Sequence, residues 1–269
     1  MTVGLLHPGA MGVTVGSSCL DEVVWCSDGR SSDTRARAAA ARFTDATTLA
    51  QVVERSDLIV SVCPPGQALS VADAVSGLGF SGVYVDANAI APSTARAIGE
   101  RFEHFVDGGI VGPPALASGT TRLYLSGGDA EHVAGRWGSP LDVRVIAGGA
   151  GAASALKMAY AMWTKISAAL LLDVRALARI EGVEEALLVE WAMSQPGTAD
   201  RSEATASRVG PKAWRFAGEM DQMAITAQDA GLPPGFADAA AEVYRRLADL
   251  KDEERPTLND VIARLVTGS

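Results

Sequence analysis

The chain has few aromatic residues, few cysteines and a deficit of positive charge. Aromatic side chains make up 6% of its 269 residues, and 32 acidic residues outnumber 23 basic ones, which gives a net charge of −9. Nucleic acids and anionic membranes bind basic surfaces, so this balance argues against both partners. The three cysteines show no metal-ligand spacing, and their odd number is typical of a reducing compartment. We therefore expect a cytoplasmic protein without a bound metal.

Long hydrophobic runs are also missing. The longest apolar helical stretch, near residues 168–172, is flanked by Lys165 and Asp173, whereas a membrane-spanning helix needs about 20 apolar residues. No cationic segment precedes the first apolar run at residue 3, so we expect neither a membrane span nor a secretory signal. With 48% apolar and 20% charged residues, the composition is typical of a globular protein of one large domain or two ordinary ones.

The first half of the chain alternates short apolar runs with helix-compatible stretches. Strands are predicted at residues 3–6, 23–26, 58–62, 83–86, 105–106, 121–125 and 143–146. Helices are predicted between them, at residues 34–41, 47–53 and 67–75. Such alternation predicts a parallel sheet with helices on both faces, the arrangement of α/β proteins.

The second half has a different pattern. Residues 152–181 contain no proline or glycine, their apolar residues recur at helical spacing, and Gly182 follows as a suitable helix terminator. A helix of about 30 residues would be on the order of 45 Å long. Further helices are predicted at residues 184–194, 212–230, 236–249 and 258–266. We therefore expect an α/β domain over residues 1–148 and an all-helical domain over residues 149–269, joined by the long helix.

A glycine-rich turn follows the first predicted strand. It consists of His7, Pro8, Gly9, Ala10, Met11 and Gly12. The order strand, glycine turn and helix start lets backbone N–H groups approach a pyrophosphate, as in the G-x-G-x-x-G pattern of Rossmann-type domains. His7 stands at the first glycine of that pattern, where it either contacts the phosphates or fills the space of the missing glycine. The sequence thus predicts a Rossmann-type dinucleotide-binding domain with its pyrophosphate site at these six residues.

The end of the second predicted strand bears on which dinucleotide binds. A site for NAD has a carboxylate at this strand end for the ribose hydroxyls, and here Ser27 holds the position. Arg30 and Ser31 offer donors that suit a 2′-phosphate. These residues predict NADP as the cofactor, and the nearby Asp28 leaves NAD as the alternative.

Five segments, in order, extend this prediction to nearly the whole chain. They are G-L-L-H-P-G-A-M-G at 4–12, D-L-I-V-S-V-C-P-P at 57–65, D-A-N-A-I-A-P at 86–92, D-G-G-I-V-G at 107–112 and G-A-A-S-A-L-K at 151–157. Together they resemble the β-hydroxyacid dehydrogenase superfamily, which includes 6-phosphogluconate dehydrogenase and 3-hydroxyisobutyrate dehydrogenase. The E-M pair at 219–220 is similar to a branch with a phosphogluconate dehydrogenase-like C-terminal domain.

The resemblance implies that Lys157 is the general acid or base of a hydride-transfer reaction. Burial and the positive end of a helix both lower the pKa of a lysine toward neutrality. The family carries an asparagine three or four residues after this lysine, where the present chain has Tyr160 and Ala161. Tyr160, and Asn88 from a preceding loop, are the candidates to orient the substrate hydroxyl, so the catalytic set is Lys157, Asn88 and Tyr160.

Further site residues follow from the same resemblance. Cys63, Pro64 and Pro65 match a strand end beside the cofactor ribose, which Asn88 also borders. The backbone of Gly108 and Gly109 would approach the substrate, and Ser154 would either line the site or pack the helix. Glu219 stands where many relatives carry a lysine, which favours a cationic or neutral polar substrate, and Lys165 is a weaker candidate for binding an acidic group. The predicted substrate-binding residues are therefore Gly108, Gly109, Ser154 and Glu219.

The sequence therefore predicts an NADP-dependent oxidoreductase that transfers hydride between nicotinamide and a small hydroxy acid or carbonyl substrate. The resemblance also implies a homodimer. One alternative is an imine reductase of the same fold, against which Lys157 argues. The other is a non-catalytic dinucleotide-binding sensor, which would fit the missing first glycine but not a retained catalytic lysine.

Overall fold

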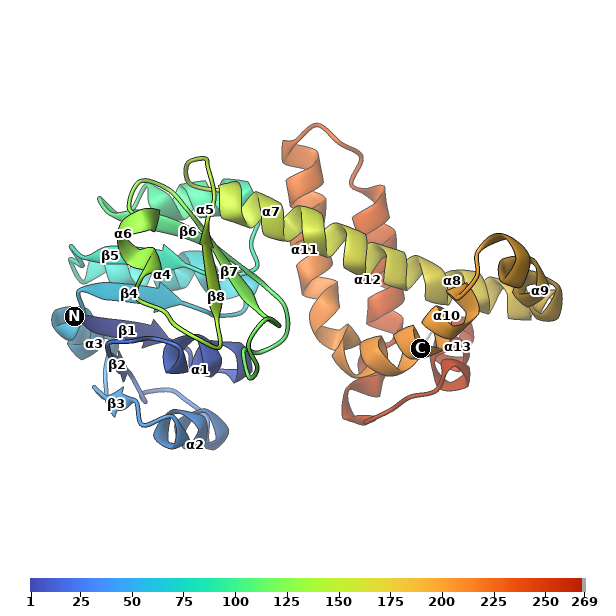
Figure 1. Cartoon of the computed structure of the whole chain (residues 1–269), viewed down its shortest axis with the longest axis horizontal. Coiled ribbons are helices and arrows are strands. Elements are labelled where there is room, and N and C mark those ends of the chain that lie inside the picture. Colours follow the sequence, from blue (N-terminus) through green and yellow to red (C-terminus); the bar gives the residue numbers. More distant parts are fainter. Residues whose placement is uncertain (268–269) are drawn as a thin grey trace. The chain divides into compact units, whose positions relative to one another are not determined.

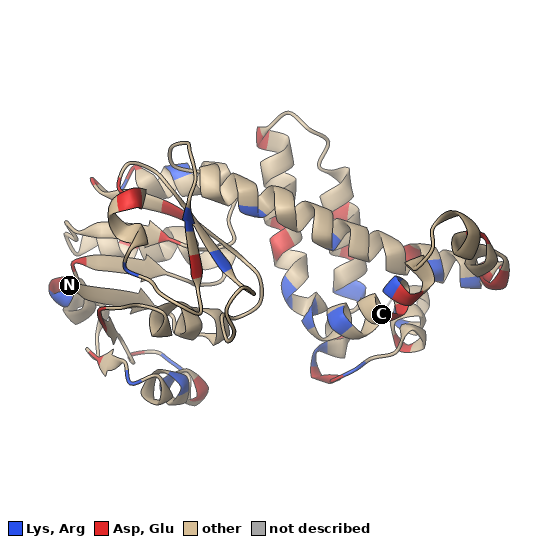
Figure 2. Cartoon of the chain, in the orientation of Figure 1, with Lys and Arg blue, Asp and Glu red and all other residues tan. Residues whose placement is uncertain are grey.

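The computed structural model describes residues 1–267 and separates into two compact units, Met1–Met158 and Ala159–Ser269. The first unit contains the whole sheet, and the second is built from helices (Figure 1). The division lies beyond the boundary expected after residue 148, because the first turns of the long helix pack on the sheet through Gly109. Figure 2 shows acidic and basic residues along the helices of both units, whereas strands β1 and β4 carry neither.

The sheet has eight strands in the order β3-β2-β1-β4-β5-β6-β7-β8. Their bounds are β1 Thr2–Leu6, β2 Glu22–Trp25, β3 Thr44–Asp45, β4 Leu58–Ser61, β5 Val83–Asp86, β6 Phe105–Val111, β7 Arg122–Ser126 and β8 Asp142–Val145. All neighbouring strands are parallel except β6 and β7, which are antiparallel. The first six strands follow the Rossmann order 3-2-1-4-5-6, and this confirms the predicted fold class.

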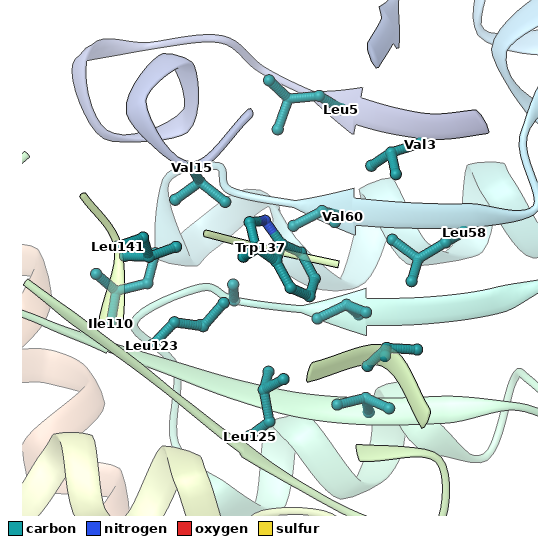
Figure 3. Packing of buried hydrophobic residues seen from close by; sticks show 14 of the residues in the cluster. Val3, Leu5, Val15, Leu58, Val60, Ile110, Leu123, Leu125, Trp137 and Leu141 are labelled. Atoms are coloured by element: carbon teal, nitrogen blue, oxygen red, sulfur yellow. The ribbon is translucent and has the colours of Figure 1, made fainter. Parts of the chain in front are cut away.

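Six helices complete the sheet-containing unit, and a seventh begins in it. They are α1 Ala10–Ser17, α2 Ser32–Ala40, α3 Leu49–Arg55, α4 Ala68–Gly77, α5 Pro92–Gly99, α6 Ala130–Ala134 and α7 Ala152–Ala161, with a short 3-10 turn at Pro65–Gln67. Because side chains alternate across a strand, the central strands bury apolar residues on both faces. Leu5, Leu58 and Val60 belong to one buried layer, while Ile59 and Tyr84 belong to the other. Figure 3 shows the first layer, with the Trp137 ring among aliphatic side chains of several strands.

The helical unit continues the chain after α7. A π-helical turn at Met162–Ile166 is followed by α8 Ser167–Ile180, α9 Glu184–Ser194, α10 Thr198–Val209, α11 Ala213–Asp229, α12 Gly235–Arg246 and α13 Leu258–Thr267, with 3-10 turns at Gly210–Lys212 and Ala248–Asp252. Its core contains Leu172, Met220, Met223, Tyr244 and Val261, each fully buried. Throughout residues 1–267, no helix combines the length and the apolar character that a membrane crossing requires.

Candidate active site

The glycine turn lies between β1 and α1, as the sequence predicts. His7 has a φ of 65°, in the left-handed region that favours glycine, so it adopts the conformation of the residue that it replaces. A Cβ on Gly12 would collide with the carbonyl oxygen of His7, whereas a Cβ on Gly9 would meet no atom within 4 Å. The turn therefore closes tightly on its inner side and leaves open space beside Gly9, at the N-terminal end of α1.

Two buried nitrogen atoms near this turn lack hydrogen-bond partners within residues 1–267. They are Nδ1 of His7 and Nε of Arg30. Burial and the charge of Arg30 lower the pKa of His7 to about 4, so its imidazole is neutral at physiological pH. Buried polar groups are normally paired, and two such orphans beside a glycine turn indicate a place where a polar ligand completes the hydrogen bonding.

The loop after β2 carries the residues expected to distinguish the two dinucleotides. Ser27 is buried, and its N–H donates to Oδ1 of Asp45 over 3.2 Å. Ser31 caps α2, because its Oγ accepts a hydrogen bond from the N–H of Thr34. The hydroxyl of Ser31 is therefore already engaged in holding the helix. Sequence reasoning missed Asp45, whose carboxylate fixes the end of β2 although it lies at the end of a strand of only two residues.

Asn88 is the centre of a buried network that joins the ends of β4 and β5. Its Nδ2 donates to Oδ2 of Asp86 over 2.8 Å and to Oγ of Ser61 over 3.1 Å. Its Oδ1 accepts a hydrogen bond of 2.5 Å from the N–H of Cys63. Both amide hydrogens are thus used within the protein, and the side chain is 2% exposed. Within the protein, Asn88 holds Cys63 and the two prolines that follow in place.

Gly108 and Gly109 lie within β6, where they pair with Leu125 and Tyr124 of β7. A Cβ on Gly108 would lie 2.8 Å from the carbonyl oxygen of Asp86. A Cβ on Gly109 would lie 2.5 Å from the carbonyl oxygen of Ala153 and 3.2 Å from Cβ of Lys157. The glycine pair therefore lets β6 approach both β5 and the first turns of α7, and Gly109 lies directly against the backbone that carries Lys157.

Ser154 is fully buried, and its Oγ donates to Oδ1 of Asp107 over 2.6 Å. Lys157 follows one turn later on α7 and is partly buried. It is the only lysine among residues 1–158. Tyr160 belongs to the helical unit, where its side chain is 48% exposed.

Glu219 forms an ion pair with Lys165 inside the helical unit. The ammonium group of Lys165 also lies 4.6 Å from the ring centre of Phe216, and the hydroxyl of Tyr244 donates to the carbonyl oxygen of Lys165 over 2.6 Å. Lys165 belongs to the π-helical turn, so Tyr244 satisfies a carbonyl group at the place where the helical pattern changes. Lys165 therefore balances the charge of Glu219 inside the helical unit.

The structure thus gathers most of the predicted site residues at one edge of the sheet. The carboxyl ends of β1, β2, β4 and β5 carry His7, Ser27, the loop from Cys63 and Asn88, and the glycine pair inside β6 lies just past the end of β5. In parallel α/β sheets, ligands bind beside this edge. Tyr160 and Glu219 belong to the helical unit instead.

Comparison with known proteins gives two likenesses in sequence. Residues 178–247 match a family model described as a domain of unknown function, DUF1932. An uncharacterized 28.5 kDa protein of Methanothermus fervidus, from the 5′ region of a 7S RNA, is 31% identical over 194 residues, which are 70% of this chain and 75% of that protein.

Two solved structures have a similar fold over nearly the full length. One is a conserved protein of unknown function, MTH1747, which is described as structurally similar to 3-hydroxyacid dehydrogenases. It is 28% identical, with a TM-score of 0.72 over 93% of this chain and 98% of that one. The other is 3-hydroxyisobutyrate dehydrogenase of Mycobacterium tuberculosis, 16% identical, with a TM-score of 0.71 over 98% of each chain. At that identity the second likeness concerns the fold alone.

Proposed function

This chain belongs to the β-hydroxyacid dehydrogenase superfamily, with a 6-phosphogluconate dehydrogenase-like C-terminal domain, and on that premise we propose that it is an NADP-dependent oxidoreductase. Its substrate would be a small hydroxy acid or the corresponding carbonyl compound. The observation that carries this proposal is the position of Lys157. The only lysine of the sheet-containing unit lies against Gly109, just past the carboxyl end of β5, where α/β proteins bind their ligands.

The residues around the glycine turn fit a dinucleotide. The backbone from His7 to Gly12 would hold the pyrophosphate at the N-terminal end of α1. The orphaned Nδ1 of His7 and Nε of Arg30 would gain hydrogen-bond partners from the ligand. The guanidinium of Arg30, with Ser27 in place of a carboxylate, supports NADP over NAD. When bound, the nicotinamide ring supplies or accepts the hydride.

Lys157 would move the proton that accompanies the hydride. In the oxidative direction, its neutral amine accepts the hydroxyl proton while the carbinol carbon loses its hydrogen as hydride. In the reductive direction, its ammonium group returns that proton to the carbonyl oxygen. Tyr160, three residues further along the same helix, would bind the substrate oxygen. Asn88, Cys63 and the prolines would shape the pocket without touching the reacting atoms.

Transfer of an isotopic label tests this function. Wild-type protein should be incubated with NADPH deuterated at C4 and a panel of small keto acids, aldehydes and cyclic imines. The proposal predicts deuterium on the carbinol carbon of a hydroxy product. Label appearing only in an amine would favour an imine reductase, and no transfer to any member of the panel would contradict oxidoreductase activity.

We further propose that the protein is a homodimer formed through its helical unit. Thirteen of the nineteen large apolar side chains that are exposed within residues 1–267 belong to this unit, the smaller of the two. Among them, Trp163, Leu170 and Leu177 recur at seven-residue spacing and are 58–74% exposed. Leu170 also borders a groove of about 370 Å³ between α8, α12 and α13, beside the exposed ring of Phe236. A self-complementary apolar patch of this kind suits a two-fold contact.

Sedimentation equilibrium tests the dimer. The wild type should give twice the chain mass of 27.8 kDa, because burying these side chains removes a large apolar area from water. The double variant Leu170→Glu, Leu177→Glu should sediment as a monomer. Leu116→Glu, which changes an exposed leucine of the sheet-containing unit, should remain dimeric. A monomeric wild type would contradict the proposal.

A further inference from the structure

Two buried carboxylates lie side by side beneath the candidate site. Asp86, the last residue of β5, pairs with Asp107 in the neighbouring strand β6, and both are 0% exposed. Burying a carboxylate is costly, so the hydrogen bonds that each of the two accepts bear directly on its charge.

The hydrogen bonds favour a negative charge on Asp107. Asp86 accepts from the N–H and Nδ2 of one residue, Asn88. Asp107 accepts from the N–H of Ser154 over 2.9 Å, from Oγ of Ser154 over 2.6 Å and from Oγ of Ser126 over 3.2 Å. Burial raises the pKa of Asp86 to about 7 and also raises the pKa of Asp107. With three donors, Asp107 is the better-stabilised carboxylate of the pair, and Asp86 is the one that retains a proton near neutral pH.

Asp107 is also attached to the start of the helix that carries Lys157. The N–H groups of Ala153 and Ser154, in the first turn of α7, donate to Oγ of Ser126 and to Oδ2 of Asp107. A carboxylate is favoured there, because the N-terminal end of a helix is electropositive. Ser154 and Lys157 are three residues apart and share a helix face, and Gly109, two residues after Asp107, lies against Lys157.

We propose that Asp107 is a positioning residue for Lys157. Through Ser154 it fixes the height and rotation of α7 against β6, and its negative charge favours the protonated amine of Lys157. The inference deepens the proposed function, because it takes Lys157 as the proton-transfer group. In the sheet-containing unit, Asp86 lies opposite Asp107 on β5, and the side chain of Arg96 on α5 borders Gly151 at the start of α7. Asp107 thus offsets the two influences, the helix end and Arg96, that disfavour a positive charge on Lys157.

The four lysines of the chain make the test direct. Protein labelled with ¹³C at lysine Cε should give four ε-methylene signals, from Lys157, Lys165, Lys212 and Lys251. The variant Lys157→Arg assigns the signal of Lys157. Its titration midpoint should fall by about half to one pH unit in Asp107→Asn, because a nearby negative charge is removed. Ser154→Ala, which keeps the carboxylate and loses one hydrogen bond, should shift the midpoint less.

Asp129→Asn is the matched control, since it removes a carboxylate that pairs with His104 rather than with a group of α7. Its midpoint for Lys157 should equal that of the wild type. If thermal melting shows that the Asp107→Asn variant is folded and its titration midpoint for Lys157 equals that of the wild type, the proposal is overturned. If that variant does not fold, the wild-type protein provides the test. Its Lys157 signal should show a second inflection at acid pH, where Asp107 protonates. The absence of this inflection would overturn the electrostatic coupling between Asp107 and Lys157.

These readouts do not depend on turnover, so the two claims fail separately. Turnover that survives the loss of Lys157 would refute the proposed function while the NMR coupling could still stand. An unchanged Lys157 titration would refute the positioning role of Asp107 while the oxidoreductase activity could still stand.

Discussion

Replacing Lys157 by methionine should lower kcat by about 10²- to 10⁴-fold, which is the usual contribution of a positioned general acid or base. Methionine keeps the length of the side chain and suits a helix, so α7 should persist. Because Lys157 is not part of the glycine turn that is proposed to hold the pyrophosphate, the affinity for NADPH should change little. Steady-state kinetics on the best carbonyl substrate, together with calorimetric titration of the nucleotide, measure the two effects separately.

Lys212→Met is the matched control for this variant. Lys212 is an exposed lysine of the helical unit, in the 3-10 turn before α11. Its replacement should leave kcat near the wild-type value. If Lys157→Met retained the wild-type kcat with any substrate that the protein reduces, another group would have to transfer the proton.

Adding a single methyl group at Gly109 should disturb both stability and catalysis. A Cβ there would lie 2.5 Å from the carbonyl oxygen of Ala153 and 3.2 Å from Cβ of Lys157, so Gly109→Ala must push α7 away from β6. Overpacking of this kind costs about 1–3 kcal/mol of the free energy of unfolding. Displacement of Lys157 should also lower kcat at least about tenfold, because proton transfer depends on position to within about 1 Å. Urea unfolding and steady-state kinetics measure these losses.

Gly135→Ala provides the comparison at a glycine without close neighbours. A Cβ at that position meets no atom within 4 Å, so its free energy of unfolding should change by no more than about 0.5 kcal/mol. A Gly109→Ala variant as stable and as active as Gly135→Ala would show that α7 does not pack closely on this part of β6.

The strongly patterned elements could be predicted from the sequence. β1, β2, β4 and β5 are short apolar runs between turns, and the structure places them within a residue or two of the expected bounds. β3 was missed because a strand of two residues is too short to show any periodicity. β6 was predicted only at its first two residues, because Gly108 and Gly109 interrupt its apolar pattern. Packing against β5, β7 and α7, rather than propensity, makes that segment a strand.

In the helical unit, local sequence patterns also failed to predict two features. α10 escaped prediction because its residues are mostly small and polar and give no apolar stripe of useful length. The predicted single helix over residues 152–181 contains a π-helical turn at Met162–Ile166. That turn is supported by the hydroxyl of Tyr244, which comes from α12, about 80 residues later in the chain, so no local signal could reveal it.

The positions of the site residues were more predictable than their contacts. The glycine turn, the Cys63 loop and Lys157 all follow from motifs, and the structure places the sheet-bound ones at one edge. Asn88 and Ser154 were assigned to ligands, yet each is used inside the protein by a partner from another strand or helix. The overlooked signal was a pair of aspartates, Asp86 at the end of β5 and Asp107 in β6, that lie opposite each other on adjacent strands. Such carboxylates need buried donors, and Asn88 and Ser154 are those donors.

The central claim is that the glycine turn, with His7 and Arg30, forms a dinucleotide site that prefers NADP. Isothermal titration calorimetry of the wild-type protein with NADPH and with NADH tests this most directly. The account predicts NADPH binding with a Kd of roughly 1–100 µM, in the range of ordinary cofactor and substrate affinities, and weaker binding of NADH. Absence of binding by either nucleotide at millimolar concentration would contradict it.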